Sequence, residues 1–292
     1  MSRSRRFLHR YAVLTATFVF LLLIAGGLVT STDSGLAVPD WPLSYGTWFP
    51  PMVGGILYEH GHRMIAAVVG IMILILAGWL WTVEPRRWVR LLGYCALAAV
   101  LVQALLGGLT VLLLLPPTVS IAHACVGQTV FCLVVCLARS TAPHWSEAPV
   151  RIQDPGHPPL RALALAVALL AVLQLFLGAI IRHTGAGLTL HVAGAMTVVL
   201  MAGWLAWRVR RFKHRDPHWS SHVKRLLGLL LTQLVVGLLV FTHRGAIGLR
   251  TAHVIIGALI LAHAIVLAWD LLRSTTSAVS VPTARSLSPQ VS

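Results

Sequence analysis

Long, continuous runs of apolar residues alternate with short polar segments along the whole chain. Eight runs are long enough to cross a hydrocarbon layer about 30 Å thick, which takes about 20 helical residues. None shows the alternation of apolar and polar residues that a membrane-spanning β-strand requires. We therefore predict eight transmembrane helices, at Tyr11–Thr30, Gly61–Val83, Leu91–Leu115, Val119–Ala138, Leu160–Ile181, Leu188–Trp207, Leu226–Thr242 and Leu249–Leu272.

The composition agrees with an all-α integral membrane protein. Of the 292 residues, 57% are hydrophobic and 11% are charged, which excludes an ordinary soluble domain. The first apolar run has no small-residue cleavage site behind it, so we expect a retained helix and not a signal peptide.

The formal charge of +15 is distributed unequally between the two sides of the membrane. Only four arginines fall on the side where helices 1, 3, 5 and 7 end, namely Arg63, Arg182, Arg244 and Arg250. The other side carries Arg3, Arg5, Arg6, Arg10, Arg86, Arg87, Arg90, Arg139, Arg151, Arg161, Arg208, Arg210, Arg211, Lys213, Arg215, Lys224 and Arg225. Because basic residues favour the cytoplasmic side, we expect both termini in the cytoplasm of a bacterium and a multi-pass protein of its inner (plasma) membrane. The charge reflects this topology and does not indicate a nucleic-acid partner.

A polar, proline-rich segment at residues 140–159 divides the chain into two sets of four helices. Residues 121–127, with His123, align with residues 251–257, with His253, and the same alignment relates His62 to His191. A Gln-x-x-x-Gly element also recurs, at 103–107, 174–178 and 233–237. The repeat predicts two pseudo-symmetric four-helix bundles, at residues 1–139 and 160–273, joined by a cytoplasmic linker at 140–159 and followed by a disordered tail at 274–292.

The repeated histidines are the main candidates for chemistry. In each half the two imidazoles lie on alternate helices at similar depth, a geometry that suits axial ligation of a haem iron from both faces. Any one histidine could equally be satisfied by a hydrogen bond to a neighbouring helix. Zinc commonly takes four ligands that include thiolates, but Cys95, Cys125, Cys132 and Cys136 all lie in or at the ends of apolar runs and form no convergent pair.

Glu59 distinguishes the first half from the second. It precedes His62 by three residues and shares its helical face, whereas Leu188 occupies the equivalent position before His191. This asymmetry suggests chemistry in the first half and electron storage in the second. The alternative is an i, i+4 ion pair between Glu59 and Arg63. His60 points to a different side of its helix from His62, and the repeat selects His62 as the ligand.

Other polar residues gather at the same ends of the helices. Arg63, Arg182, Arg244 and Arg250 are candidates for binding haem propionates through bidentate hydrogen bonds, with interfacial snorkelling as the alternative. His183 and His243 are repeat-related as well, and they either contact a propionate or face water; we do not expect them to bind iron.

The motifs together resemble the heme A synthase family. They are Gly35-Leu-Ala-Val-Pro-Asp-Trp-Pro-Leu-Ser-Tyr-Gly46, Glu59-His-Gly-His-Arg-Met64 and the histidines at 123, 191 and 253. The resemblance covers nearly the whole chain and implies oxidation of the C8 methyl group of heme O to the formyl group of heme A, which some cytochrome oxidases need.

The resemblance also implies a role for each half. His62 and His123 would hold the substrate haem, and His191 and His253 would hold a haem b that passes electrons. Glu59 would assist the oxidation, either by stabilising a cationic intermediate or by moving protons. The haem sites would face the periplasm, and the implied partners are membrane lipid, the enzyme that produces heme O and an electron donor, with a homo-oligomer left open.

The loop after the first helix departs from the family pattern. Many bacterial members carry two cysteines there, but this chain has Val38 and Ser44 at the corresponding positions, so a disulfide or thiol role is excluded. The loop keeps proline and aromatic residues that suit a lid over the haem site, and we expect Asp40 to cap a turn.

Two other functions remain open from the sequence. A dihaem electron-transfer cytochrome would retain haem in both halves and tolerate replacement of Glu59. A non-enzymatic haem-handling assembly factor or transporter would bind haem transiently and convert none.

Overall fold

A computed structural model describes residues 3–146, 152–212 and 217–277. Within these residues the chain forms eight long α-helices, each long and apolar enough to cross a membrane, which confirms the predicted fold class. They are α1 (Arg3–Ser31), α2 (Gly55–Val83), α3 (Arg87–Leu112), α4 (Pro117–Thr141), α5 (Leu160–Thr184), α6 (Leu188–Val209), α7 (Pro217–Thr242) and α8 (Ile247–Ser274).

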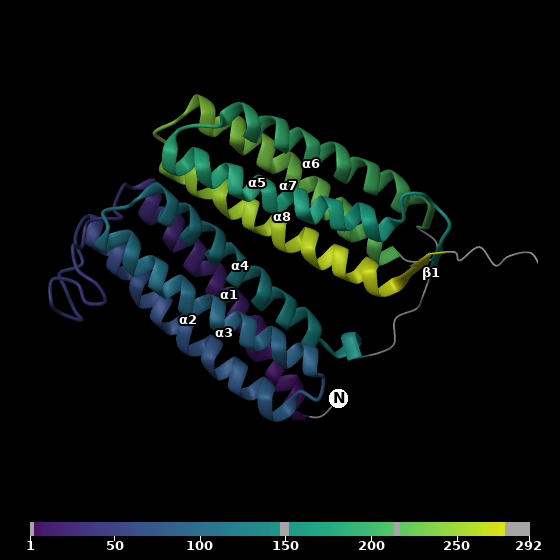
Figure 1. Ribbon diagram of the computed structural model, residues 1–292, viewed down its shortest axis with the longest axis horizontal. Coiled ribbons are helices and arrows are strands. Elements are labelled where there is room, and N and C mark those ends of the chain that lie inside the picture. The colour runs from purple at the N-terminus through teal and green to yellow at the C-terminus, as the bar shows by residue number, and fades with distance from the viewer. Residues whose placement is uncertain (1–2, 147–151, 213–216, 278–292) are drawn as a thin grey trace, which may run out of the picture.

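The helices form two side-by-side groups, α1–α4 and α5–α8, with α1 and α4 of the first group packed against α5 and α8 of the second (Figure 1). We call the end that carries the loop at residues 32–54 the loop end. The opposite end, where α1 begins, is the terminal end. Each odd-numbered helix runs from the terminal end to the loop end, and each even-numbered helix returns.

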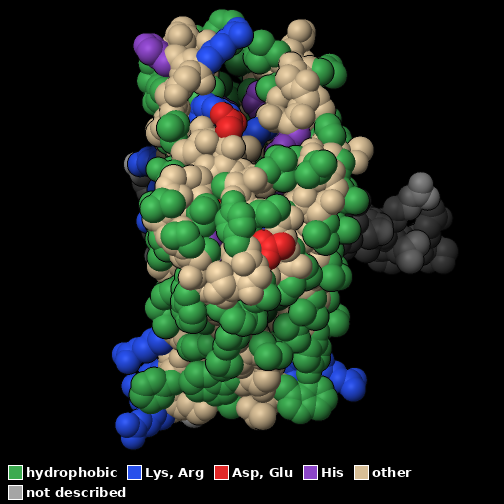
Figure 2. All heavy atoms as spheres, turned by 90° about the vertical axis from the view of Figure 1, so that its left-hand side faces the viewer, with side chains coloured by type: hydrophobic (Ala, Val, Ile, Leu, Met, Phe, Trp, Pro, Cys, Tyr) green, Lys and Arg blue, Asp and Glu red, His purple; other side chains and the backbone are tan. Residues whose placement is uncertain are grey.

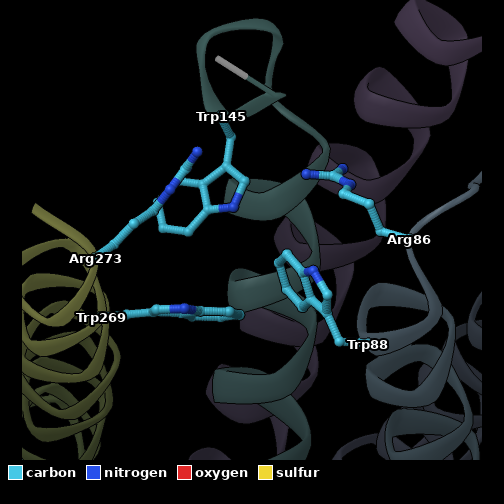
Figure 3. Close-up of a pocket in the computed structure, with 5 residues that line it drawn as sticks. All are labelled: Arg86, Trp88, Trp145, Trp269 and Arg273. Atoms are coloured by element: carbon cyan, nitrogen blue, oxygen red, sulfur yellow. The ribbon is translucent and has the colours of Figure 1, made fainter. Parts of the chain in front are cut away.

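Apolar side chains fill each group of helices and the seam between them. Small buried residues of the second group, Ala171, Ala258 and Ala262, pack with the core of the first, and small side chains let membrane helices approach closely. At the terminal end the rings of Trp88 (α3) and Trp269 (α8) meet across the seam with centroids 5.5 Å apart (Figure 3).

Helix α3 ends at Leu112, so the prediction that it continues to Leu115 was wrong. Leu114 and Leu115 have φ angles of 59° and 60°, outside the right-handed helical region. Leu115 also precedes Pro116, and a residue before proline is sterically disfavoured from the helical conformation. The hydrophobic pattern alone could not locate this end, since the apolar run continues through it.

Parts of the segments predicted as a linker and as a disordered tail form regular structure. Helix α4 is followed by a 3₁₀ turn, η1 (Pro143–Ser146), and then by a short strand, β1 (Ile152–Asp154). A second 3₁₀ turn, η2 (Arg210–Phe212), follows α6. Strand β1 pairs in parallel with β2 (Thr275–Ser277), directly after α8. Buried Asp154 accepts a hydrogen bond from the Leu160 N–H at the start of α5 and pairs with Arg208 at 3.0 Å. Residues 278–292 of the predicted tail, and Arg151, Lys213 and Arg215 of the basic set, lie outside the described residues.

Candidate functional site

All four repeated histidines lie at the loop end of the molecule. They lie near the starts of α2, α4, α6 and α8, the helices that begin at this end, and each is among the first eight residues of its helix: His62, His123, His191 and His253. Each side chain is half-buried. The loop end faces the viewer in Figure 2, where histidine side chains are visible between apolar walls in the upper part of the face.

Each histidine packs against a glycine of the preceding helix. A Cβ atom built on Gly107 of α3 would lie 3.2 Å from His123 Cε1, and the equivalent distances are 3.1 Å from Gly178 (α5) to His191 and 3.0 Å from Gly237 (α7) to His253. In the first helix pair, a Cβ on Gly26 would lie 3.1 Å from His62 Nε2. Each imidazole therefore occupies space that exists because the neighbouring helix has no side chain there.

Three of the four histidines also contact a glutamine one turn from that glycine. The side-chain amide nitrogen of Gln103 lies 3.3 Å from His123 Nε2, that of Gln174 lies 3.0 Å from His191 Nδ1, and that of Gln233 lies 3.3 Å from His253 Nε2. Gln174 and Gln233 donate as well to the backbone carbonyls of their histidines, at 2.9 and 3.0 Å.

The recurring Gln-x-x-x-Gly element is thus explained by packing, a role that the sequence signalled but did not reveal. Glutamine and glycine four residues apart share a helical face, and together they border the histidine of the next helix. In α1 the residue four before Gly26 is Leu22. His62 consequently has no glutamine from this element, and it differs in this from the other three.

The imidazoles of the second bundle face one another. The ring centroids of His191 and His253 are 6.3 Å apart, with the ring planes inclined by 61°. Two imidazoles that each bind one metal through a nitrogen at about 2 Å would have centroids separated by about 6 Å. The pair is therefore spaced as two axial ligands of one iron would be.

Buried polar atoms without partners point to a bound group in the same region. His123 Nδ1, His253 Nδ1 and the side-chain oxygens of Gln103, Gln174 and Gln233 are buried and make no hydrogen bond with any described residue, which is costly in an apolar environment. The described residues contain no group of three or more His, Cys, Asp or Glu side chains that could hold a metal ion. Paired imidazoles in an apolar bundle suit a haem, whose porphyrin supplies the remaining iron ligands.

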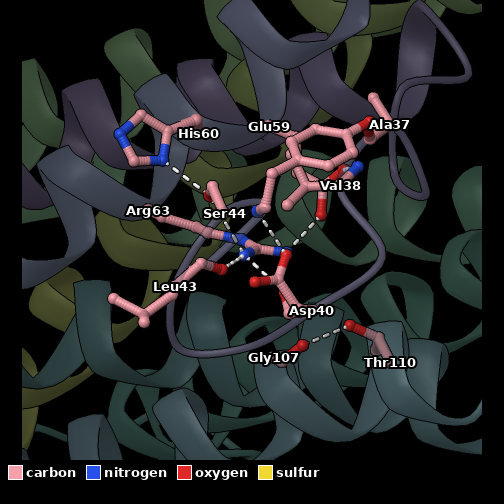
Figure 4. A network of polar contacts seen from close by, with 11 residues as sticks. Ala37, Val38, Asp40, Leu43, Ser44, Glu59, His60, Arg63, Gly107 and Thr110 are labelled. Carbon is pink, nitrogen blue, oxygen red and sulfur yellow. Dashed lines mark hydrogen bonds and ion pairs between the residues drawn. The ribbon is translucent and has the colours of Figure 1, made fainter. Parts of the chain in front are cut away.

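Glu59 lies in a buried polar network at the mouth of the first bundle (Figure 4). Its Oε1 is 2.6 Å from Arg63 Nη2, and its Oε2 accepts a 2.7 Å hydrogen bond from the Val38 N–H. The sequence left open that Glu59 only forms an ion pair with Arg63, and this ion pair is present. It does not remove the asymmetry, because Leu188, at the equivalent position of α6, is an exposed apolar residue.

Arg63 holds the loop in place through the other side of its guanidinium group. Arg63 Nη1 donates to the carbonyl oxygens of Asp40 and Leu43, both at 2.7 Å (Figure 4). Together with the Glu59 contact, these bonds engage both terminal nitrogens within the protein. Arg63 therefore anchors the loop, a role that the sequence did not assign.

Val38 and Ser44, which stand where the family pattern has cysteines, both contact residues near the start of α2. The backbone of Val38 binds Glu59, and Ser44 Oγ lies 2.8 Å from His60 Nδ1. Val38 and Ser44 are completely buried, and the four cysteines of the chain are free. Hydrogen bonds here join the loop to α2, and His60 has a loop-anchoring role that the sequence did not assign.

The rest of the loop covers α3. A Cβ on Gly108 would lie 2.8 Å from the ring of Trp41, so this indole rests directly on the α3 backbone. Asp40 caps the loop turn, as predicted, by accepting hydrogen bonds from the Tyr45 N–H at 2.7 Å and the Gly46 N–H at 2.8 Å. The hydrogen bond from Gly46, followed by that from Tyr45 and the nearby charge of Arg63, holds the pKa of Asp40 below its usual value.

The remaining arginines at the loop end differ in their surroundings. Arg182 donates to Ser31 Oγ at 3.0 Å, and Arg250 donates to the Ser31 carbonyl at 3.3 Å, so both connect the second bundle to the end of α1. Arg244 is exposed and stacks on Phe241 at 5.2 Å. His243 is also exposed, with Nδ1 2.9 Å from Thr242 Oγ1, and His183 is half-buried near the end of α5.

The sequence interpretation did not single out a further histidine pair near the terminal end. His222 (α7) and His263 (α8) stack with centroids 5.2 Å apart and planes inclined by 20°. His263 Nε2 lies 2.8 Å from the His222 carbonyl oxygen. This local contact joins α7 to α8 away from the four repeated histidines.

Comparison with known proteins identifies the wider group. The family model described as cytochrome oxidase assembly protein (COX15-CtaA) matches residues 9–55 and 53–193, which is more than half of the chain. This range contains Glu59, His62, His123 and His191.

Several curated relatives are heme A synthases. The chain is 32% identical to that of Lysinibacillus sphaericus over 189 residues, which is 64% of this chain and 61% of the relative, less than two thirds of its length. The relative from Halalkalibacterium halodurans is 25% identical over 262 residues, 80% of this chain and 86% of the relative. The one from Symbiobacterium thermophilum is 28% identical over 238 residues, 71% and 77% of the two chains.

Proposed function

The chain belongs to the cytochrome oxidase assembly protein family, and from this we propose that it is a heme A synthase, a multi-pass membrane oxidoreductase. It oxidises the C8 methyl group of heme O to the formyl group of heme A, for assembly into cytochrome oxidase. The proteins named heme A synthase that align with most of its length support this activity.

One observation carries the assignment: the histidine site of the first bundle has a buried carboxylate beside it, and that of the second bundle does not. Among the described residues, four acidic side chains are buried, namely Glu59, Glu84, Asp154 and Asp270. Only Glu59 lies at the loop end, one turn from His62. The second bundle has an apolar residue, Leu188, in its place. A carrier of electrons alone would have no need for this difference.

We propose that each cradle holds one haem. His62 and His123 would bind the substrate heme O, and His191 and His253 would bind a resident haem b. When bound, haem b would supply reversible one-electron transfer. A glycine lies against each imidazole and a glutamine contacts three of the four, and such supporting contacts commonly determine ligand orientation and metal affinity.

Glu59 is positioned so that its carboxylate could assist the oxidation. If water supplies the formyl oxygen, conversion of a methyl group to a formyl group releases protons, and electrons that haem b would pass on. A carboxylate beside the substrate can then accept a proton or stabilise a developing positive charge. The Val38 N–H and Arg63 fix both oxygens of Glu59. The loop that provides Val38 also rests on α3 through Trp41 and covers this side of the first bundle.

We propose that this chemistry takes place on the outer side of a bacterial inner membrane. Basic residues concentrate at the terminal end, and we propose that this end is cytoplasmic. The loop end, with the four histidines, then faces the periplasm. Heme O would come from the membrane enzyme that makes it, and an electron acceptor or donor would connect with the second bundle. Arg182, Arg244 and Arg250 remain candidates for propionate contacts.

The test is haem extraction and chromatography from cells that produce heme O together with this protein. We would compare the wild type with Glu59→Gln and with Glu84→Gln, a buried carboxylate that pairs with Arg86 at 2.7 Å at the opposite end. Heme A should accumulate with the wild type and Glu84→Gln and fall at least tenfold with Glu59→Gln.

The same experiment distinguishes the other functions. Haem bound stably to the wild type, with no heme A formed, would indicate a dihaem electron-transfer cytochrome. Neither heme A nor stably bound haem would indicate an assembly factor that handles haem transiently. Equal heme A yields from Glu59→Gln and the wild type would remove Glu59 from the proposed mechanism.

A further inference from the structure

A pocket of about 210 Å³ opens at the terminal end, in the seam between the two bundles. Its walls are Arg86 and Trp88 at the start of α3, Trp145 of η1, and Trp269 and Arg273 near the end of α8 (Figure 3). The pocket therefore draws on both halves of the chain. It lies at the opposite end of the molecule from the four repeated histidines, so the proposed haem chemistry does not use it.

Three indole rings give the pocket apolar walls with a fixed arrangement. Trp269 stands between the other two, with its centroid 5.5 Å from that of Trp88 and 5.5 Å from that of Trp145. Both contacts are edge-to-face, with ring planes inclined by 64° and 76°, a favourable geometry for aromatic pairs. Indole rings are enriched where a membrane protein meets the lipid headgroups.

Guanidinium groups supply the polar part of the pocket. Arg273 lies over the Trp145 ring at 4.4 Å, Arg86 lies over Trp88 at 5.4 Å, and Arg139 approaches Trp145 at 5.1 Å. These stacking contacts hold the arginine side chains at the pocket wall, where cation–π contacts remain compatible with hydrogen bonds from the guanidinium edge.

The local charge is positive after the acidic neighbours are counted. Glu84 pairs with Arg86 at 2.7 Å and Asp270 pairs with Arg139 at 3.0 Å. Burial alone would raise the pKa of Glu84, but the hydrogen bonds from Arg86 outweigh it and the pKa lies below its usual value. Among the described residues, Arg86, Arg139 and Arg273 together with Glu84 and Asp270 carry one formal positive charge in sum.

We propose that this pocket binds the phosphate group of an anionic phospholipid. The pocket lies at the end of apolar, membrane-length helices, at the level where headgroups lie. Basic pockets between transmembrane helices on the cytoplasmic side bind such headgroups, and guanidinium groups match phosphate oxygens through paired hydrogen bonds. Its volume of about 210 Å³ is large enough for a phosphate group. The bound lipid would bridge the two bundles at the seam.

The test uses the full-length protein, purified in a neutral detergent and freed of lipid. Tryptophan fluorescence and native mass spectrometry would follow titrations with phosphatidylglycerol, phosphatidylcholine and inorganic phosphate, with Trp269→Phe identifying the signal from the pocket. Phosphatidylglycerol should bind at least fivefold more tightly than phosphatidylcholine, since an arginine near an anionic lipid contributes about a fivefold gain.

Variants of two stacked arginines separate this site from general surface charge. Arg273→Gln should reduce phosphatidylglycerol affinity about fivefold, with Arg273→Lys intermediate. Arg90→Gln removes the same charge from the same end, where Arg90 stacks on Trp81 at 5.6 Å outside the pocket, and should change little. Equal binding of both lipids, equal losses in the two glutamine variants, or phosphate alone saturating the pocket signal would overturn the proposal. The circular dichroism spectrum of each variant would show that it is folded.

Discussion

Gly107 of α3 lies directly against His123 of α4, so that a Cβ atom at residue 107 would be 3.2 Å from His123 Cε1. The same relation recurs between each of the other repeated histidines and a glycine of the helix before it. The position of every proposed ligand therefore depends on a missing side chain in a neighbouring helix. This relation makes the proposed haem sites sensitive to the smallest possible substitution.

Gly107→Ala should weaken haem binding in the first bundle. The added methyl group is closer to the imidazole than an ordinary van der Waals contact allows, so His123 must shift by a few tenths of an ångström. Small displacements of ligands commonly reduce metal affinity about 10- to 100-fold. The haem-to-protein ratio of the purified variant, measured by absorbance, would show the loss.

Gly70→Ala is the matched control for that experiment. Gly70 lies in α2, and a Cβ there meets no atom within 4 Å, so haem content should stay unchanged. Replacement of a helical glycine by alanine should also stabilise the helix by about 0.5–1 kcal/mol. If both variants bound haem like the wild type, the glycine contact would not control the position of His123.

Gln233→Leu should weaken haem binding in the second bundle, although the variant retains both histidines. The Gln233 amide lies 3.3 Å from His253 Nε2 and donates to the His253 carbonyl oxygen at 3.0 Å. Leucine keeps the approximate volume and removes both contacts. We expect haem affinity to fall about tenfold, with a shifted absorption or magnetic resonance signal. Gln128→Leu, in α4 and outside the repeated element, is the control, and an equal effect would contradict a specific positioning role.

The sequence predicted the helices well because a membrane span is determined locally, by a run of about 20 apolar residues. It failed at Leu114 and Leu115, where the apolar run continues but both residues have positive φ angles outside the right-handed helical region. It also missed strand β2, because the pairing partner Ile152–Asp154 lies far away in the sequence. A pattern within one segment cannot report contacts that only the assembled bundles create.

The sequence likewise predicted the candidate site residues more readily than it predicted the side chains and backbone groups that contact them. Internal repetition related His62 to His191 and His123 to His253 and showed the recurring Gln-x-x-x-Gly element. It did not show that this element contacts the histidine of the next helix, because that contact forms only between helices. Arg63 illustrates the limit most clearly. Its charge and position were compatible with a propionate, whereas the carbonyl oxygens that bind it belong to a loop whose conformation the sequence pattern does not specify.

Glu59 and Arg63 should show strong energetic coupling. Their side chains are 5% and 14% exposed, and removal of one partner from a buried ion pair costs about 3–5 kcal/mol. Glu59→Gln and Arg63→Gln should each lower the thermal unfolding temperature in detergent, and the double variant should lose less than the sum. Additive losses in this double-mutant cycle would show that the two side chains act independently.

The loop that covers the first bundle should loosen in acid because of Asp40. Its pKa is lower in the folded loop than in the unfolded chain, through the hydrogen bonds from Gly46 and then Tyr45. The carboxylate therefore stabilises the loop above the unfolded pKa of about 4. That contribution disappears as the pH falls through the lower, folded value.

Limited proteolysis of the loop from pH 7 down to pH 3 would measure this change. Cleavage of the wild type should increase over the most acidic part of the range, where Asp40 takes up its proton. Asp40→Asn should be cleaved faster at pH 7, because a neutral amide accepts the Gly46 and Tyr45 hydrogen bonds less strongly than a carboxylate, and its cleavage should depend less on pH. An Asp33→Asn variant, altered at an exposed carboxylate before the turn, controls for general charge. If Asp40→Asn and the wild type gave the same pH profile, the turn at Asp40 would not be the acid-sensitive part of the loop.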